Sequence, residues 1–165
     1  MSRLKVTLDI SGKVLAAMKN LSRDQVLVGI PSTAAEREPD PDDPEPINNA
    51  AIGFLMENGS PAQNLPARPH VKPGIMDAKD EIIRRYETGG RAILEGRITD
   101  PDVIHEAVGI VAENAIKAKI ADGQFVPLSP RTLAARRRKG RTSEKPLQDT
   151  GQYRNAITHV IRPKA

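Results

Sequence analysis

Residues 31–46 limit what this chain can fold into more than any other segment. Five of these 16 residues are prolines, and six are acidic against the single base Arg37, a local net charge of −5 (−6 + 1). The acidic residues are Glu36, Glu38, Asp40, Asp42, Asp43 and Glu45. Proline removes backbone donors and like charges repel one another, so neither a helix nor a strand is favoured here. We predict a long exposed loop, and loops of this length in compact domains are usually functional or disordered.

A second segment, residues 129–145, carries the opposite charge. Seven bases stand against Glu144, a local net charge of +6 (7 − 1). The bases are Arg131, Arg136, Arg137, Arg138, Lys139, Arg141 and Lys145. The whole chain of 165 residues carries only +4, so its charge is segregated rather than merely positive.

Three interpretations of the basic run stay open. It can be a solvated helix face, it can pair with an acidic partner surface such as the 31–46 loop of a neighbouring copy, or it can contact phosphates. The run lacks interleaved aromatic residues that would stack on bases, and it shows no recognition-helix or zinc-finger pattern. A small DNA-binding protein that uses residues 131–141 is therefore the alternative to a protein-binding function.

Hydrophobic periodicity predicts strands near both ends of the chain and helices between them. Strands are expected at residues 4–10, where apolar and polar residues alternate, and at the apolar runs 26–30 and 157–161. The first helix is expected to begin at a Ser11 cap and to carry the apolar stripe Val14, Ala17, Met18 and Leu21. Longer helices are expected at 47–58, at 75–95 with a kink at Gly89-Gly90, and from Asp100-Pro101 to about 120. Short helices are expected after Ser129-Pro130 and after a cap at Asp149. The helices at 75–95 and 100–120 are expected to form an antiparallel pair.

Two segments carry signals that bear on partners. Apolar residues lie on more than one side of the 47–58 helix, so it is predicted to be either deeply buried or packed on another chain. Residues 60–69 contain three prolines, which favour an extended arm.

These elements predict a single α+β domain over residues 1–165. It would contain a small, mostly antiparallel sheet packed with a pair of longer helices, an exposed acidic loop at 31–46 and a basic helix and linker at 129–148. Only two Phe, two Tyr and no Trp are present, so the core must consist mainly of Ala, Val, Ile and Leu. Such a core favours additional stabilisation by neighbouring subunits.

Catalytic signals in the chain favour structural interpretations. Asp149-Thr150-Gly151 is the tripeptide of aspartic proteases, in which two such aspartates share a proton across a dimer. That motif follows an apolar strand, whereas residues 145–148 here are Lys-Pro-Leu-Gln, so a cap and turn are the favoured interpretation. We expect no enzyme activity and no cofactor.

The three histidines do not predict a metal site. His70, His105 and His159 lie in separate predicted elements, with His105 expected to face solvent and His159 expected in or beside the last strand. The chain has no cysteine, so disulfides, thiol catalysis and Cys-ligated metals are excluded. No stretch approaches the roughly 18 apolar residues that cross a bilayer, and the first residues lack the apolar core of a signal peptide. We therefore expect a soluble protein that remains where it is made, without a membrane partner.

Two stretches together resemble a known family. One is Leu128-Ser129-Pro130-Arg131-Thr132-Leu133, followed by Arg136 or Arg137, Gly140 and residues 145–151; the other runs from Ala51-Ile52-Gly53 through Glu57-Asn58-Gly59 to residues 65–69. In order and spacing they resemble the tail-completion (neck, head–tail joining or virion morphogenesis) proteins of long-tailed bacteriophages. The chain departs from that pattern at His70, where a large apolar residue is expected, and at Tyr153 and Ala156, which replace Leu and Ser.

The resemblance implies a structural protein of the virion, assembled in the host cytoplasm and located at the neck or tail. It implies a homo-oligomeric ring of six around the DNA channel, docked to neighbours such as the tail terminator, the head-completion protein or the tail tube. Non-specific contact with DNA in the channel is the lesser option. Arg68, in the second stretch, joins the six acidic residues and the basic run as an expected partner interface. No catalytic residue is implied.

Overall fold

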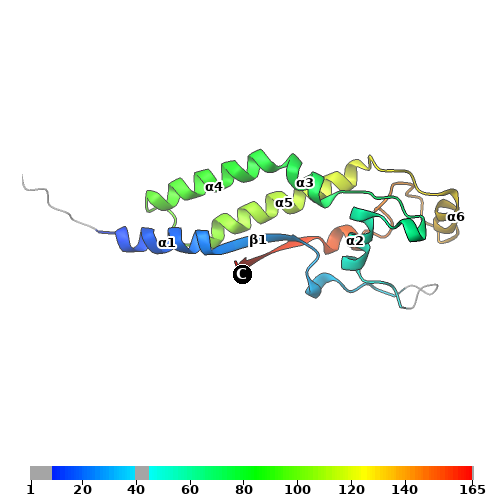
Figure 1. The fold of residues 1–165 in the computed structure, drawn as a ribbon, viewed down its shortest axis with the longest axis horizontal. Coiled ribbons are helices and arrows are strands. Elements are labelled where there is room, and N and C mark those ends of the chain that lie inside the picture. The colour runs from blue at the N-terminus through cyan, green and yellow to red at the C-terminus, as the bar shows by residue number, and fades with distance from the viewer. Residues whose placement is uncertain (1–8, 40–44, 165) are drawn as a thin grey trace, which may run out of the picture.

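The computed structural model describes residues 9–39 and 45–164, and it has an elongated shape (Figure 1). Its elements in chain order are α1 (Ser11–Arg23), β1 (Asp24–Gly29), η1 (Ser32–Ala34), α2 (Asn49–Asn58), η2 (Pro61–Gln63), α3 (Val71–Asp77), α4 (Lys79–Leu94), α5 (Asp102–Asp122), α6 (Pro130–Arg138), α7 (Gln152–Ala156) and β2 (Thr158–Pro163). The predicted α+β fold, with one small antiparallel sheet and a pair of longer helices, is confirmed.

The longest helix, α5, organises the fold. Its buried apolar residues recur every four positions, which places them on one face; they are Ile104, Val108, Ala112, Ile116 and Ile120. Helices α3 and α4 pack along α5 (Figure 1), so the predicted pair is present. Gly123 adopts the left-handed conformation that ends the helix, as expected (φ +72°).

The predicted kink at Gly89-Gly90 is wrong. Helix α4 runs continuously through both glycines, and the chain instead breaks at Ala78, between α3 and α4. Gly89 has a packing role, because a Cβ there would lie 2.7 Å from the side chain of Ile104 on α5. The missing side chain lets the two helices approach each other.

The sheet is a two-stranded antiparallel ladder that joins distant parts of the chain. Asp24 pairs with Pro163 at one end, and Gly29 pairs with Thr158 at the other. The strands predicted at 26–30 and 157–161 are thereby confirmed as β1 and β2. The strand expected at residues 4–10 falls almost entirely outside the described residues, and its last residue, Ile10, precedes α1.

Two apolar clusters form the core, one in each half of the molecule. The first contains Ala17, Ile93 and Ile104, with Val14, Met18 and Leu21 of the predicted α1 stripe packed against it. The second contains Ile116, Ile120, Tyr153 and Ile157, with Ile52 and Ile75 packed against it. Helix α5 contributes residues to both clusters and thereby ties the two halves together; it runs along much of the molecule in Figure 1.

Several predicted ends and exposures need correction. Asp9, not Ser11, supplies the cap of α1, because the Asp9 carboxylate accepts the N–H of Ser11 at 2.9 Å. Helix α2 is capped by Asn48, whose side chain accepts the N–H of Ala51, and Asn49 is its only buried residue. Phe54 on this helix is 69% exposed, so deep burial within the chain is wrong.

Residues 60–69 do not form an extended arm throughout. Ser60 and Leu65 pair as an isolated β-bridge, which closes the short η2 turn between them. Asn64 ends that turn in the left-handed conformation (φ 51°), which asparagine tolerates better than most residues. The remainder of the segment is irregular and leads to the buried His70.

Candidate functional site

The two stretches that carry the family resemblance meet around one cavity of about 520 Å³. The lining includes residues from 52–68 of one stretch and from 128–136 and 146–151 of the other. We name this cavity the arginine pocket after Arg37, Arg68 and Arg136, which all line it. Much of the remaining wall is apolar and includes Ile52, Met56, Leu65, Leu128, Leu147 and Tyr153.

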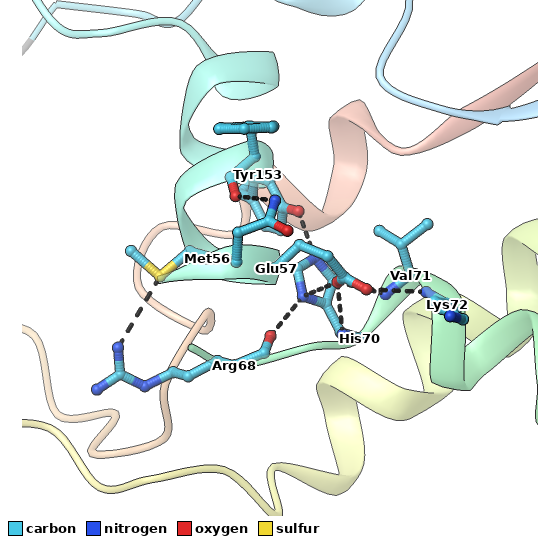
Figure 2. A network of polar contacts seen from close by, with 9 residues as sticks. Met56, Glu57, Arg68, His70, Val71, Lys72 and Tyr153 are labelled. Atoms are coloured by element: carbon cyan, nitrogen blue, oxygen red, sulfur yellow. Dashed lines mark hydrogen bonds and ion pairs between the residues drawn. The ribbon is translucent and has the colours of Figure 1, made fainter. Parts of the chain in front are cut away.

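A carboxylate on α2 holds the start of α3 next to this pocket. Glu57 accepts the backbone N–H groups of His70 and Val71 through one oxygen (2.8 and 2.9 Å) and that of Lys72 through the other (3.1 Å) (Figure 2). The first N–H groups of a helix have no partner within the helix, so this remote side chain supplies what a local cap otherwise would. Burial acts to raise the pKa of Glu57, but the three amides outweigh it and hold that pKa below its usual value.

His70 is fully buried and both its ring nitrogens are bonded. Nδ1 lies 2.8 Å from the carbonyl oxygen of Arg68, and Nε2 bonds the hydroxyl of Tyr153 on α7 (Figure 2). A carbonyl only accepts, so Nδ1 carries the proton and Nε2 accepts the Tyr153 O–H. Burial lowers the pKa of His70, which favours this neutral form.

Tyr153 joins α7 to the packing of α2. Burial, together with the charge of Glu57, raises the pKa of Tyr153, which keeps its hydroxyl protonated as the donor to His70. A Cβ at Gly53 would lie 3.1 Å from that hydroxyl oxygen, so the glycine gives the tyrosine room beside α2. The network therefore joins α2, α3 and α7 at one point.

Arg68 lies in the wall of the pocket and is only 5% exposed. Its Nε donates to the carbonyl of Val126 at 2.9 Å, and Nη2 donates to that of Pro127 at 3.1 Å. These bonds fasten the irregular segment after α5 to the segment before α3. Arg68 was expected in a partner interface; within the chain it is buried.

Arg136 also makes internal contacts instead of facing solvent. Its side chain is 10% exposed, and its Nη1 donates to the carbonyls of Ser143, Lys145 and Gln148 at 2.8–3.3 Å. Its Nε lies 3.4 Å from Asp149. One guanidinium thus organises the loop between α6 and α7.

Asp149 does not cap α7, so that expectation is wrong. Its carboxylate lies 2.6 Å from Nη1 of Arg141 as well as close to Arg136. The first N–H of α7, on Gln152, instead lies 3.4 Å from the hydroxyl oxygen of Thr150. The Asp-Thr-Gly tripeptide therefore forms part of the loop that Arg136 holds.

The other predicted interface residues are spread around the pocket and beyond it. Arg131, Arg138 and Lys139 are exposed on or just after α6, and Arg137 forms an ion pair with Glu144 at 2.7 Å. Glu36, Glu38 and Glu45 are exposed, and Glu38 lies 3.5 Å from the side-chain nitrogen of Gln152. Asp40, Asp42 and Asp43 lie outside the described residues.

No family model, curated protein or solved structure matches this chain.

The Glu57–His70–Tyr153 network was not predicted from the sequence. His70 was considered there as one of three separate histidines and, together with Tyr153, as a departure from the family pattern. Both positions were expected to hold apolar residues, and a polar pair replacing an apolar pair is a signal of contact that could have been used. Glu57 gave no signal, because its three partners are backbone amides 13 to 15 residues away.

The remaining two histidines lie outside this network. His105 is 1% exposed, so its predicted solvent exposure is wrong; it packs against Tyr86 of α4, with Nδ1 3.2 Å from the hydroxyl. His159 lies in β2 as expected, 3.0 Å from Glu106 and 3.0 Å from Glu113. Burial acts to lower the pKa of His159, but the two carboxylates outweigh it and raise that pKa.

Within residues 9–39 and 45–164, no group of three or more His, Asp or Glu side chains is arranged to hold a metal ion. In the same part of the chain, no helix is both long enough and apolar enough to span a bilayer.

Proposed function

We propose that this chain is a structural subunit of the phage neck or tail-completion complex and acts by forming a ring through head-to-tail contacts. One observation carries the proposal. The two stretches that resemble the family are about 60 residues apart in sequence, yet residues of both line the arginine pocket. If the resemblance of the two stretches to the family arose by chance, there would be no reason for both stretches to line the same pocket.

Exposed apolar side chains supply two different surfaces for such contacts. Phe54 (69% exposed) and Met76 (56% exposed) line a largely apolar groove between α2 and α3 that also includes Ile30 and Ile75. Leu15, Leu94 and Val103, which are 58–72% exposed, come from α1, the end of α4 and the start of α5. These elements meet at the opposite end of the molecule (Figure 1). A head-to-tail ring needs two unlike surfaces on each subunit.

A mixing experiment tests the head-to-tail arrangement. The double variant Phe54→Glu/Met76→Glu should disable one surface, and Leu15→Glu/Leu94→Glu should disable the other. Native mass spectrometry should find rings for the unchanged protein, monomers for each variant alone, and discrete dimers when the variants are mixed, because one intact interface remains between them. Monomers of the unchanged chain at every salt concentration, alone and with its neck partners, would contradict the proposal.

The DNA-binding alternative has less support from the described contacts. Arg136, Arg137 and Arg141 of the basic run each form an internal ion pair. Arg131 and Arg138 stay exposed on α6, so the alternative remains a prediction. If it holds, affinity for duplex DNA should fall steeply with salt and should drop for the variant Arg131→Ala/Arg138→Ala.

A further inference from the structure

Arg68 is a buried cation whose charge has no counter-ion in the described part of the chain. A guanidinium has five N–H donors, but only two of those on Arg68 reach carbonyl oxygens. The hydrogen-bond partner of its Nη1 among the described residues is the sulfur of Met56, at 3.9 Å (Figure 2). No carboxylate oxygen among residues 9–39 and 45–164 lies within 4.0 Å of it. A buried charge is costly unless it is paired.

The rest of the arginine pocket adds to this positive charge. Arg37 also lines it, and the buried Nε of Arg37 has no hydrogen-bond partner. Arg136 is matched by Asp149, which is the one acidic residue in the described lining. Arg37 and Arg68 therefore present positive charge within a confined, partly apolar space, where electrostatic attraction is stronger than in water.

The shape and the remaining wall restrict what can enter. A volume of about 520 Å³ lies within the usual range of small-ligand pockets, about 300–1,000 Å³. Leu65, Leu128 and Leu147 offer apolar contact next to the arginines. A phosphodiester backbone would place polar sugars against these leucines, whereas a peptide can offer a charge and an apolar side chain together.

We propose that the arginine pocket binds a carboxylate of a partner protein, presented by a peptide segment in which an apolar side chain lies next to the charged group. The free donors of Arg68 and Arg37 bind the carboxylate, since a guanidinium matches two carboxylate oxygens at once. The leucines hold the neighbouring apolar side chain. This inference goes beyond ring formation, because a ring can close with the pocket empty and a monomer can fill it.

A matched pair of small probes tests the charge requirement. N-acetyl-leucine carries a carboxylate beside an isobutyl group, and N-acetyl-leucinamide has the same shape without the charge. NMR titration that follows the arginine Nε–H signals should show at least tenfold tighter binding of the acid. Equal binding of the two probes, or tighter binding of inorganic phosphate than of N-acetyl-leucine, would overturn the proposal.

Three variants separate binding from folding. Arg37→Gln should keep the melting temperature and weaken N-acetyl-leucine binding several-fold, because Arg37 makes no hydrogen bond through Nε that folding needs. Arg68→Met should abolish binding, and Arg131→Gln on the exposed face of α6 should change nothing. Unchanged affinity in Arg37→Gln together with unchanged affinity in a folded Arg68→Met would show that the pocket is not the site. If Arg68→Met does not fold, the Arg37→Gln result decides alone.

Discussion

The two halves of the molecule each bury a histidine against a tyrosine, and they treat it differently. In the half that contains α2, α3 and α7, His70 has a partner for each ring nitrogen. In the half that contains α1 and α4, His105 has Tyr86 as a partner for Nδ1, whereas its buried Nε2 has no partner in the described structure. His70 lies among irregular segments and His105 lies within a long helix. Helical backbone hydrogen bonds already hold the segment around His105, whereas side-chain hydrogen bonds of His70 help to hold the irregular segments around it.

The two halves also differ in how closely a helix approaches α5 at a glycine. A Cβ at Gly74 of α3 would lie 2.8 Å from the Cα of Ile116, so the backbones of α3 and α5 are in direct contact. At Gly89 of α4 the obstacle is only the Ile104 side chain. A backbone obstacle moves only with its whole helix, whereas the Ile104 side chain, although buried, requires only local repacking. The half around the pocket is therefore expected to tolerate less change.

The largest effect is expected for His70→Leu. It leaves the Tyr153 hydroxyl and the Arg68 carbonyl without their partner, so the free energy of unfolding should fall by about 2–5 kcal/mol. Urea unfolding followed by circular dichroism measures this change. Tyr153→Phe, which removes one of these bonds and little volume, should cost less than His70→Leu. A loss below about 1 kcal/mol for His70→Leu would mean that the network does not hold this half.

Next in size is the contrast between two glycine substitutions. Gly74→Ala should destabilise the protein by about 1–3 kcal/mol, because the added methyl group meets the backbone of α5. Gly89→Ala should cost less, because Ile104 can move and alanine favours the helix. Gly90→Ala is the control: nothing lies within 4 Å of its Cβ position, so it should stabilise α4 by about 0.5–1 kcal/mol. Equal losses at positions 74 and 89 would remove this difference between the halves.

A smaller change is expected for His105→Leu. The substitution removes a buried nitrogen that has no partner but leaves the Tyr86 hydroxyl unpaired, so the two effects offset each other. The free energy of unfolding should stay within about 1 kcal/mol of the original value. Because His105→Leu and His70→Leu are the same substitution in different halves, measuring both by urea unfolding under the same conditions compares the halves directly. A loss as large as that of His70→Leu would show that the halves depend equally on their histidines.

The smallest effects are expected from pH. The pKa of His70 is lowered in the folded state, so the unfolded state binds a proton more readily, and stability should fall as the pH drops below the ordinary value of 6.5. The pKa of His159 is raised, so its contribution is present below 6.5 and is lost as the pH rises through its folded pKa. Melting temperatures across pH 5–8 should show the loss above 6.5 shrink in His159→Gln. If the dependence of melting temperature on pH were the same in His159→Gln as in the unchanged protein, His159 would not be the source of the loss above pH 6.5.

The regular elements could be predicted from the sequence, because periodicity and end signals are local. The stripe of α1, the Ser129 cap of α6 and the Gly123 end of α5 all depend on residues within a few positions of one another. The break at Ala78 could not be predicted, because it follows from packing of α3 on α5. The glycine pair at 89–90 predicted a kink that is absent, because at Gly89 the missing side chain serves the packing of α4 on α5.

The candidate site was harder to predict than the fold. The basic run could be found by counting charges, but the contacts of its members could not be predicted in this way. Whether Arg136 faces solvent or donates to three carbonyl oxygens depends on the conformation of the loop before α7. Arg68 reaches carbonyls 58 and 59 residues away, which no local pattern indicates. His105 shows the same limit, since it was expected to face solvent and the packing against Tyr86 buries it.

The pairing of β1 with β2 has a consequence for the order of folding. Residues 24–29 find their only described strand partner at residues 158–163, so the ladder closes a loop of nearly the whole chain. Contacts between residues so far apart form late and slow the overall reaction. On the ribosome, β1 would remain with both of its edges unpaired while the helices assemble, and β2, which is synthesised after them, would complete the sheet.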